Sequence, residues 1–393
     1  MPHVKIKPIS SEEFETRASK YPDIIEFIAH SLNYNELLIS VNYENEKFLL
    51  IYKYDNSEGL LKYEKITRPL KLTTLKEAIG RVAKVLDLEI LSSNIDNLNK
   101  KPPPLFASKY YKKIEDFKEI HFDFGKVAIE VGFGSGRHIL YQAAQNPDML
   151  YIGIEIHTPS AQQLLKQIEI QNLNNIWVVN YDARLFLEMM PSNIAKQIFV
   201  HFPVPWDKKP NRRVISVDFV REAMRVLDMG GTLELRTDSD LYYRYSLEVF
   251  SSFEKIKMQI QKNFALPIIS KYEARWQRQK KDIYDITIVC DEKSEKLDNN
   301  FLFSFDEISY NISMMGNLPR ESNIYKSFFV HFERFYMIGK ESMMIRCAFG
   351  DFARPEHKYI ILNKEGCYYY HSEPIRSRAN FDAHIMIKEL LNA

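Results

Sequence analysis

The chain has 393 residues, 45% of them hydrophobic and 27% charged, and its formal net charge is +1. This balance excludes a protein held to nucleic acid by its overall charge, so any such affinity must come from local patches. The three scattered cysteines, Cys290, Cys347 and Cys367, provide neither a disulfide framework nor a metal-binding spacing. The N-terminus lacks an apolar signal core, and no apolar stretch is long enough to span a membrane. We therefore expect a soluble cytoplasmic protein of two or three domains, without membrane or metal partners.

The first block, residues 1–99, is predicted to be a small α+β accessory domain. Two alternating apolar runs between residues 36 and 55 flank the polar turn 44–46, which predicts a hairpin. A helical spacing of apolar residues follows at 74–87. The lysine- and proline-rich stretch 100–104 then begins a linker that we place at 100–120.

The middle block, residues 121–293, alternates strand and helix patterns. Strands are predicted at 126–131, 150–155, 176–179, 197–202, 231–236 and 283–290, and the helices between them include 158–172 and 217–228. Such alternation predicts an α/β fold with a doubly wound, Rossmann-like parallel sheet. Ligands of this architecture lie at the carboxyl ends of the strands.

A glycine-rich loop follows the first strand of this block. Gly132, Gly134 and Gly136 let the backbone turn sharply and approach a ligand before a helix begins. Glu130 lies inside the preceding apolar run, where an unpaired carboxylate would be costly. We therefore expect Glu130 to have a partner, and a ligand's ammonium group or amide donors would suit its position.

The next two strands indicate which cofactor the loop holds. The spacing is G-x-G-x-G, and Arg137 stands where dinucleotide-binding loops have a third glycine. Glu155 ends the second strand, where it suits two ribose hydroxyls, and Asp182 follows the third, where it suits an adenine amine. Each acid alone is typical of a surface or capping residue. Together, at successive strand ends, they favour S-adenosylmethionine over NAD.

Two basic segments indicate an RNA partner. Residues 207–213 carry four positive charges and one negative, and residues 271–281 carry five and one. Both segments are expected on loops at the ligand end of the sheet, where Trp206 and Trp276 could stack on exposed bases. A single basic loop is usually only solvated, but two beside a cofactor site favour RNA contact.

The final block, residues 295–393, is predicted to be an antiparallel α+β domain. Strand-like runs occur at 327–339, 342–349, 358–362 and 367–373, and a helix is predicted near 380–391. The aromatic run 368–370 could stack bases, but such residues more often fill a sheet face, and we favour that interpretation.

The motifs of the middle block resemble those of the bacterial tRNA (guanine-N7)-methyltransferase family. The similarity rests on VAIEVGFGSG at 127–136, IGIEIH at 152–157, FVHFPVPWDKKPNRR at 199–213 and RTDSD at 236–240, and covers about 121–293. It implies an S-adenosylmethionine-dependent enzyme that methylates N7 of a guanine in the variable loop of tRNA. It implies cofactor-binding roles for Glu130, Glu155 and Asp182, and substrate-binding roles for Lys208, Asp238, Ser270, Lys271, Tyr272 and Glu273.

For Glu273 we can state a more specific hypothesis, namely that it selects guanine. Its carboxylate could accept hydrogen bonds from N1–H and the N2 amine of guanine, while N7 on the opposite edge faces the methyl donor. Adenine lacks that pair of donors, so this contact would select guanine. An ordinary ion pair with Arg275 or Lys271 is the alternative.

One position departs from the family pattern, because Val204 stands where the family has an aspartate between two prolines. Guanine N7 already presents a lone pair and carries no proton, so methyl transfer needs no general base. The enzyme must supply alignment and tolerance of the arriving positive charge. Asp207, Asp238 or Glu273 could take over part of that role, so we expect activity.

Two alternatives stay open. The first is an RNA-binding or assembly protein that keeps the fold and the cofactor without catalysis, which Val204 would permit. The second is a methyltransferase for a different RNA, because the flanking blocks could redirect specificity. A dehydrogenase is disfavoured by Arg137.

Overall fold

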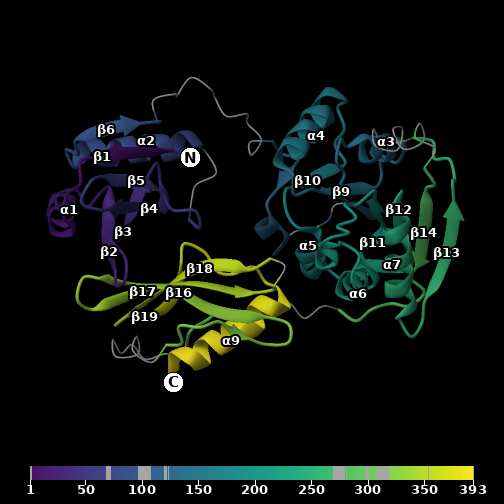
Figure 1. Ribbon diagram of the computed structural model, residues 1–393. Coiled ribbons are helices and arrows are strands. Elements are labelled where there is room, and N and C mark those ends of the chain that lie inside the picture. Colours follow the sequence, from purple (N-terminus) through teal and green to yellow (C-terminus); the bar gives the residue numbers. More distant parts are fainter. Residues whose placement is uncertain are drawn as a thin grey trace. The chain divides into compact units, whose positions relative to one another are not determined.

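The computed structural model describes residues 2–67, 72–95, 108–118, 122, 124–268, 279, 281–296, 301–306, 308, 318–352 and 354–392 (Figure 1). The chain forms two compact units. We call Pro104–Asn300 the central unit, and Met1–Pro103 together with Phe301–Ala393 the flanking unit.

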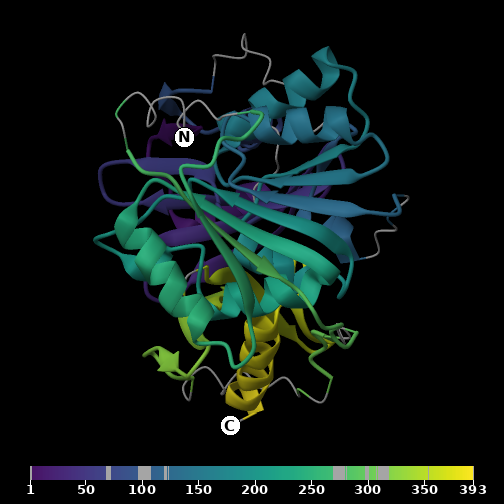
Figure 2. The same cartoon turned by 90° about the vertical axis from the view of Figure 1, so that its right-hand side faces the viewer.

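The central unit contains an eight-stranded sheet in the order β13-β14-β12-β11-β8-β9-β10-β7. Its strands are β7 (Tyr111–Lys112), β8 (Val127–Val131), β9 (Leu150–Ile154), β10 (Ile176–Val179), β11 (Ala195–His201), β12 (Leu227–Thr237), β13 (Lys257–Lys262) and β14 (Tyr284–Val289). The strands from β7 to β12 pair in parallel, and β14 and β13 complete one edge in antiparallel pairing. Figure 2 views the sheet from its β13 edge and shows its twist.

Among the described residues, five α-helices cover the two faces of this sheet: α3 (Arg137–Gln145), α4 (Thr158–Ile170), α5 (Ala183–Met189), α6 (Val217–Val226) and α7 (Asp240–Ser251). Helices α3 and α4 lie on one face, and α5, α6 and α7 lie on the other (Figure 1). Every residue of β8 and β9 is buried, because both faces of a doubly covered sheet are closed to water. The predicted doubly wound α/β fold is confirmed.

The topology places a site at the centre of the sheet. From β8 the chain proceeds outward through β9 to β10, and then crosses to β11 on the opposite side of β8. The crossovers therefore leave in opposite directions from β8 and β11. In such sheets, ligands bind beyond the carboxyl ends of the strands at this reversal.

Two strands of the central unit escaped prediction, for different reasons. Strand β13 is a polar, largely exposed edge strand, so it lacks the apolar signature of a buried strand. Strand β7 has only two residues and pairs with β10. It falls within the stretch 100–120, which was predicted to be a linker, and the short helix η2 (Ile114–Lys118) follows it. The central unit thus begins earlier than the predicted domain.

The flanking unit contains an eleven-stranded sheet in the order β19-β18-β17-β16-β2-β3-β4-β5-β1-β6, with β15 paired to β16. Its strands are β1 (His3–Ile6), β2 (Ile25–Ser31), β3 (Glu36–Tyr43), β4 (Glu46–Tyr54), β5 (Gly59–Tyr63), β6 (Ile90–Ser93), β15 (Asn323–Ile324), β16 (Phe329–Ile338), β17 (Ser342–Gly350), β18 (Glu356–Asn363) and β19 (Gly366–Tyr370). Its helices are α1 (Ser11–Ala18), α2 (Leu72–Val85) and α9 (Arg378–Asn392). The predicted hairpin is β3–β4, closed by Glu44 and Asn45 at positive φ as its two-residue turn requires.

The two ends of the chain share this sheet, whereas the sequence suggested two separate accessory domains. Strand β2 pairs with β16 in antiparallel fashion, with Tyr336 opposite Ser31. Glu36 is buried beside this junction, where its carboxylate binds Lys53 and Arg334 and accepts a hydrogen bond of 2.8 Å from the Tyr336 hydroxyl. Burial opposes ionisation of Glu36, but these donors hold its pKa below the ordinary value. No periodicity in the sequence reports a pairing between segments about 300 residues apart.

A second polar group lies on the C-terminal strands of the same sheet. The Arg346 guanidinium donates to Glu333 at 2.6 Å, and a ring nitrogen of His357 lies 3.4 Å from the same carboxylate. Burial opposes ionisation, but His357 and Arg346 outweigh it and lower the pKa of Glu333 to about 2. Because this folded-state pKa lies below that of an unfolded glutamate, the stabilisation is complete above pH ~4.3 and is lost as the pH falls towards 2.

We predict that Glu333→Gln lowers the free energy of unfolding by on the order of 2 kcal/mol at neutral pH. The difference from the wild type should narrow as the pH falls below about 4.3, because the wild-type carboxylate then takes up a proton. Urea titrations followed by circular dichroism at several pH values would measure it. Glu341→Gln, which removes an exposed pair with Lys364, is the control and should show little effect at any pH. A difference that does not change with pH would contradict the prediction.

Candidate active site

The glycine-rich loop connects the end of β8 to α3 at the reversal point of the central sheet. Gly132, Gly134 and Gly136 all have positive φ, at 70°, 53° and 73°. A Cβ on Gly136 would lie 2.7 Å from the Leu164 side chain, so this glycine lets α4 pack against the loop. A Cβ on Gly132 would meet nothing within 4 Å. That side of the loop therefore has room for a ligand among the described residues.

Glu155 joins the loop to the neighbouring strand end. One carboxylate oxygen accepts a hydrogen bond of 3.1 Å from the Gly134 amide, and the other accepts one of 2.9 Å from the His157 amide. The side chain of Asn180 donates to the Glu155 carbonyl at 2.6 Å, which links the ends of β9 and β10. A carboxylate has about four acceptor positions, so Glu155 keeps capacity for further donors such as hydroxyls.

Asp182 lies at the start of α5, directly after β10. Its side chain caps the helix by accepting from the Arg184 amide at 3.0 Å, and it pairs with the Arg184 guanidinium at 2.8 Å. The predicted position at the third strand end is therefore observed. Arg184 shares the carboxylate, and any adenine contact must use its remaining acceptor positions.

Glu130 has a protein partner. Its carboxylate lies 2.8 Å from Nδ1 of His138, the second residue of α3. The His138 ring lies 4.6 Å from the ring of His201, whose Nε2 is 2.8 Å from Glu234 in β12. This Glu130–His138–His201–Glu234 network spans three neighbouring strands beneath the glycine loop.

Sequence reasoning missed the other three members of the network, His138, His201 and Glu234. Burial raises the pKa of Glu234, but hydrogen bonding and charge from His201, with help from His138, leave it below the ordinary value. The only signal in the sequence was a histidine at the end of an apolar run, as in His201. Whether His201 lies beside His138 depends on the order of the strands in the sheet, and the sequence does not state that order.

The segment after β11, residues 202–213, is held in an uncommon backbone conformation. Phe202 and Trp206 have positive φ, at 50° and 46°, although neither is a glycine. The Phe202 amide donates to the Arg236 carbonyl of β12 at 2.7 Å, which fixes the start of the segment. Val204 lies between these two residues with 61% of its surface exposed. Such strain in a loop at a ligand edge is typical of functional sites.

Arg213 anchors the far end of the segment and is structural. Its guanidinium donates to the Pro205 carbonyl at 2.7 Å, and it lies 4.4 Å from the ring centre of Tyr245. Asp207 lies 3.4 Å from the same guanidinium, yet half of its side chain (51%) remains exposed. Arg212 lies over the Trp206 ring at 5.2 Å.

The rest of the predicted substrate side is only partly described. Lys208 is exposed and forms no ion pair with another described residue. Asp238 follows β12, and its side chain, 18% exposed, pairs with Lys281 at 2.8 Å. Ser270, Lys271, Tyr272, Glu273 and Trp276 lie outside the described residues. Below Asp238, the buried pair Arg236–Asp285 ties β12 to β14.

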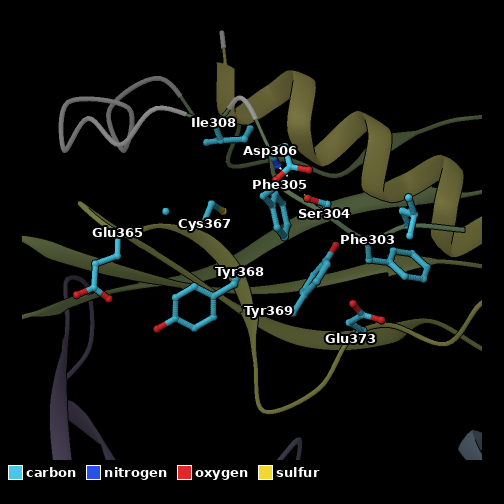
Figure 3. A pocket seen from close by; sticks show the side chains of 12 residues that line it. Phe303, Ser304, Phe305, Asp306, Ile308, Glu365, Cys367, Tyr368, Tyr369 and Glu373 are labelled. Atoms are coloured by element: carbon cyan, nitrogen blue, oxygen red, sulfur yellow. Dashed lines mark hydrogen bonds between the residues drawn. The ribbon is translucent and has the colours of Figure 1, made fainter.

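The aromatic run 368–370 fills a sheet face for the most part, as the sequence interpretation favoured. Tyr369 and Tyr370 are buried, and their hydroxyls bond to His384 at 3.0 Å and to Ser40 at 2.8 Å. Tyr368 is more exposed and lines a cavity of about 600 Å³. Figure 3 shows the carboxylates of Glu365 and Glu373 on either side of the aromatic rings. These carboxylates, with that of Asp306, make the cavity unsuitable for phosphates.

Within the described part of the chain, no group of three or more His, Cys, Asp or Glu side chains could hold a metal ion. No helix in the same residues is long and apolar enough to cross a membrane.

Comparison with known proteins gives close relatives over the whole chain. The chain is 39% identical over 402 residues to a tRNA (guanine-N(7)-)-methyltransferase of Wolinella succinogenes, with 100% of both proteins covered. It is 37% identical to the Campylobacter jejuni protein of that name, with 100% of this chain and 98% of the relative covered. It is 38% identical to the Helicobacter acinonychis protein of that name, with 90% of this chain and 88% of the relative covered. The resemblance seen in the middle block thus extends to both flanking blocks.

Two further comparisons concern the central unit and solved structures. A protein-family model described as "Putative methyltransferase" matches residues 125–286. The crystal structure of the 16S rRNA methyltransferase KamB is 16% identical with a TM-score of 0.35, and covers 45% of this chain and 92% of its own. A putative methyltransferase from Streptococcus mutans in complex with SAH is 13% identical with a TM-score of 0.32, and covers 50% and 99%.

We predict that Glu155→Gln weakens the binding of S-adenosylmethionine about ten-fold. The carboxylate now accepts hydrogen bonds from two backbone N–H groups. In the variant the amide NH2 would face one of these donors, lose that hydrogen bond and loosen the glycine loop. Isothermal calorimetry would measure the affinity. Glu248→Gln, an exposed position on α7, is the matched control and should bind as the wild type does. Equal affinities in the two variants would remove Glu155 from the cofactor site.

Proposed function

The chain belongs to the tRNA (guanine-N(7)-)-methyltransferase family, and from this premise we propose that it transfers a methyl group from S-adenosylmethionine to N7 of a guanine in tRNA. The observation that carries the proposal is the bond between Glu155 and the Gly134 amide at the reversal point of the sheet. This bond joins the glycine loop, which has room for a ligand beside Gly132, to the Glu155 carboxylate, which can accept hydrogen bonds from a ribose. The variable loop is the expected position of the guanine, on family resemblance alone, and the cytoplasm is the proposed location because tRNA is the proposed substrate.

The residues at the strand ends fit this cofactor. Gly132 and Gly134 leave the loop open on the ligand side, Glu155 has free acceptor positions for the ribose, and Asp182 can accept from the adenine amine. When bound, S-adenosylmethionine supplies an electrophilic methyl group on a sulfonium. Glu130, at the end of β8, is held by His138 of α3 and supports the loop and this helix. Its predicted contact with the ligand remains a proposal.

The chemistry requires alignment more than proton transfer. Guanine N7 is an acceptor with a lone pair and no proton, so no side chain has to act as a base. Positive charge arrives on the purine as the bond to the methyl carbon forms and the bond to sulfur breaks. Acidic side chains near the base stabilise that charge. Val204 cannot do this, so we assign the role to acids that follow it in the chain.

Asp207 and Asp238 are the two described candidates. Asp207 follows β11, the strand next to β8, and half of its side chain is exposed. Asp238 lies one strand further, is mostly covered, and is paired with Lys281. Asp207 is therefore the better placed of the two to face a base, and Asp238 is better suited to hold Lys281. Glu273 keeps its proposed role in selecting guanine.

The same edge offers groups for the RNA backbone. Lys208 and Lys209 are exposed, and Trp206 presents part of its ring beside Arg212. Phosphates favour such lysines, and unpaired bases favour such rings. Arg213 is excluded from this role, because its guanidinium is buried in the segment that it anchors.

The decisive experiment incubates the purified chain with labelled S-adenosylmethionine and unmodified tRNA, followed by nucleoside analysis. We expect the label in 7-methylguanosine. Cofactor binding without any methylated product would favour the RNA-binding alternative, which Val204 keeps open. Label in another nucleoside, or in an RNA other than tRNA, would favour a different substrate.

We predict that Asp207→Asn lowers kcat about ten-fold, because the amide cannot stabilise the positive charge on the purine. Affinity for S-adenosylmethionine should not change. Steady-state kinetics with saturating tRNA would measure kcat. Asp218→Asn, at an exposed site on α6, is the control and should keep full activity. If Asp207→Asn kept the wild-type kcat while Asp238→Asn lost it, the two roles would be exchanged.

A further inference from the structure

Helices α1 and α2 cover one face of β4 and β5. The other face buries Leu49 and Ile51 with side chains of the C-terminal strands and leaves Lys53 and Lys62 partly exposed. In β4 and β5, one set of alternating side chains, such as Leu50 and Leu61, packs into the core with α1 and α2. The other set includes Lys53 and Lys62, which therefore lie on the opposite face. Lys62 lies opposite Ile51 in the register, so Lys53 and Lys62 are diagonal neighbours, on the order of 7–8 Å apart at their backbones.

Two lysines of this cluster, Lys62 and Lys65, have no carboxylate partner among the described residues, whereas Lys53 is paired with Glu36. Burial and the charges of Lys53 and Lys65 lower the pKa of Lys62, and Glu36 offsets only part of this repulsion. Lys62 and Lys65 form no ion pair with another described residue. The Glu36 carboxylate is already shared by Lys53, Arg334 and Tyr336, and that of Glu64, which precedes Lys65 in the chain, lies 3.6 Å from Arg346. A bound anion would relieve the repulsion between the lysines.

An exposed aromatic ring adjoins the lysines through the same carboxylate. Arg334, which binds Glu36, lies over the ring of Tyr34 at 4.2 Å. Tyr34 belongs to the turn between β2 and β3, and 54% of its surface is exposed. The Glu36 amide donates to the Tyr34 carbonyl at 2.8 Å, which holds the turn in place. The ring is therefore fixed at its backbone, backed by a guanidinium, and accessible.

We propose that this surface, made of Lys53, Lys62, Lys65, Arg334 and Tyr34, binds the tRNA substrate outside the active site. The lysines contact backbone phosphates, and Tyr34 stacks on an unpaired base. Because the chain as a whole carries a charge of only +1, such a local patch is what RNA affinity requires. The proposal rests on the proposed function for the identity of the RNA.

RNA fits this surface better than an acidic protein does. A planar ring backed by an arginine matches the flat face of a base, and aromatic stacking with charge-assisted contacts is the usual way to bind unpaired RNA. The cavity of Figure 3, in the same unit, has the opposite character, because three carboxylates line it. The phosphate contacts proposed here thus fall on basic side chains and not on acidic ones.

The test compares two full-length variants with equal changes of charge. Lys62→Glu/Lys65→Glu reverses two charges of the proposed surface. The control, Lys20→Glu/Lys84→Glu, reverses the charges of two exposed lysines, one after α1 and one on α2. These two helices pack on the opposite face of the sheet. Filter binding with unmodified tRNA at several salt concentrations gives the Kd and its salt slope. We expect the first variant to bind at least about ten-fold more weakly, with the slope reduced by about 1–2. The control should match the wild type.

Kinetics separate this proposal from the proposed function. In Lys62→Glu/Lys65→Glu, the KM for tRNA should rise while kcat at saturating tRNA and the affinity for S-adenosylmethionine stay unchanged. If the wild type forms 7-methylguanosine and both variants have the same Kd and KM, the surface proposal is overturned and the function stands. If the wild type forms no product but the first variant alone loses tRNA binding, the proposed function is overturned and the surface proposal stands. Lys62→Gln/Lys65→Gln repeats the test should the charge reversal unfold the unit.

Tyr34 tests the stacking contact separately. Tyr34→Ala should weaken tRNA binding about five-fold or more, and Tyr34→Phe should bind as the wild type does, because the ring and not the hydroxyl makes the contact. Unchanged binding by Tyr34→Ala would overturn the stacking contact. Binding of an acidic protein that depends on these residues, with unchanged tRNA affinity, would overturn the assignment to RNA.

Discussion

The pairing of β8 with β9 on one side and β11 on the other is the constraint on which the candidate active site depends. It turns the chain back at the middle of the sheet and brings the glycine loop, Glu155 and the strained segment after β11 to one edge. The bond from the Gly134 amide to Glu155 then fixes the loop against the neighbouring strand. Without this order, the same motifs would end at separate places along the sheet. The site is thus a property of topology that hydrogen bonds complete.

Charged and titratable groups at this end of the sheet have two kinds of environment. The Glu130–His138–His201–Glu234 network is mostly covered and pairs its own acids, so it supports α3 and β11. Asp207 and Lys208, in the segment after β11, are exposed and available to a substrate. This division suits methyl transfer to an atom that carries no proton. The reaction needs the guanine to be held in position and needs surroundings that stabilise the positive charge that forms on it. A valine at position 204 is compatible with such chemistry.

The flanking unit depends on one buried carboxylate in a comparable way. Glu36 binds Lys53 from β4 and Arg334 from β16, so it connects strands from the two ends of the chain. The same contact places the Arg334 guanidinium over Tyr34. Removing one partner would leave a charge buried without compensation, which is much more costly than losing a surface pair. The exposed surface proposed to bind RNA is therefore built on a structural ion pair, and both flanking blocks are needed to form it.

The sequence by itself determined the strands from β8 to β12, the hairpin β3–β4 and the positions of Glu155 and Asp182 at strand ends, because periodicity and glycine spacing are local. It missed the edge strand β13, whose polar side chains carry no apolar pattern. Only the tertiary structure decided that β2 pairs with β16, that His138 is the partner of Glu130, and that Arg213 is an anchor and not an RNA contact. Each of these depends on which distant segments meet. That choice is made by burying apolar faces and pairing charges across the whole fold, and no short window of residues records it.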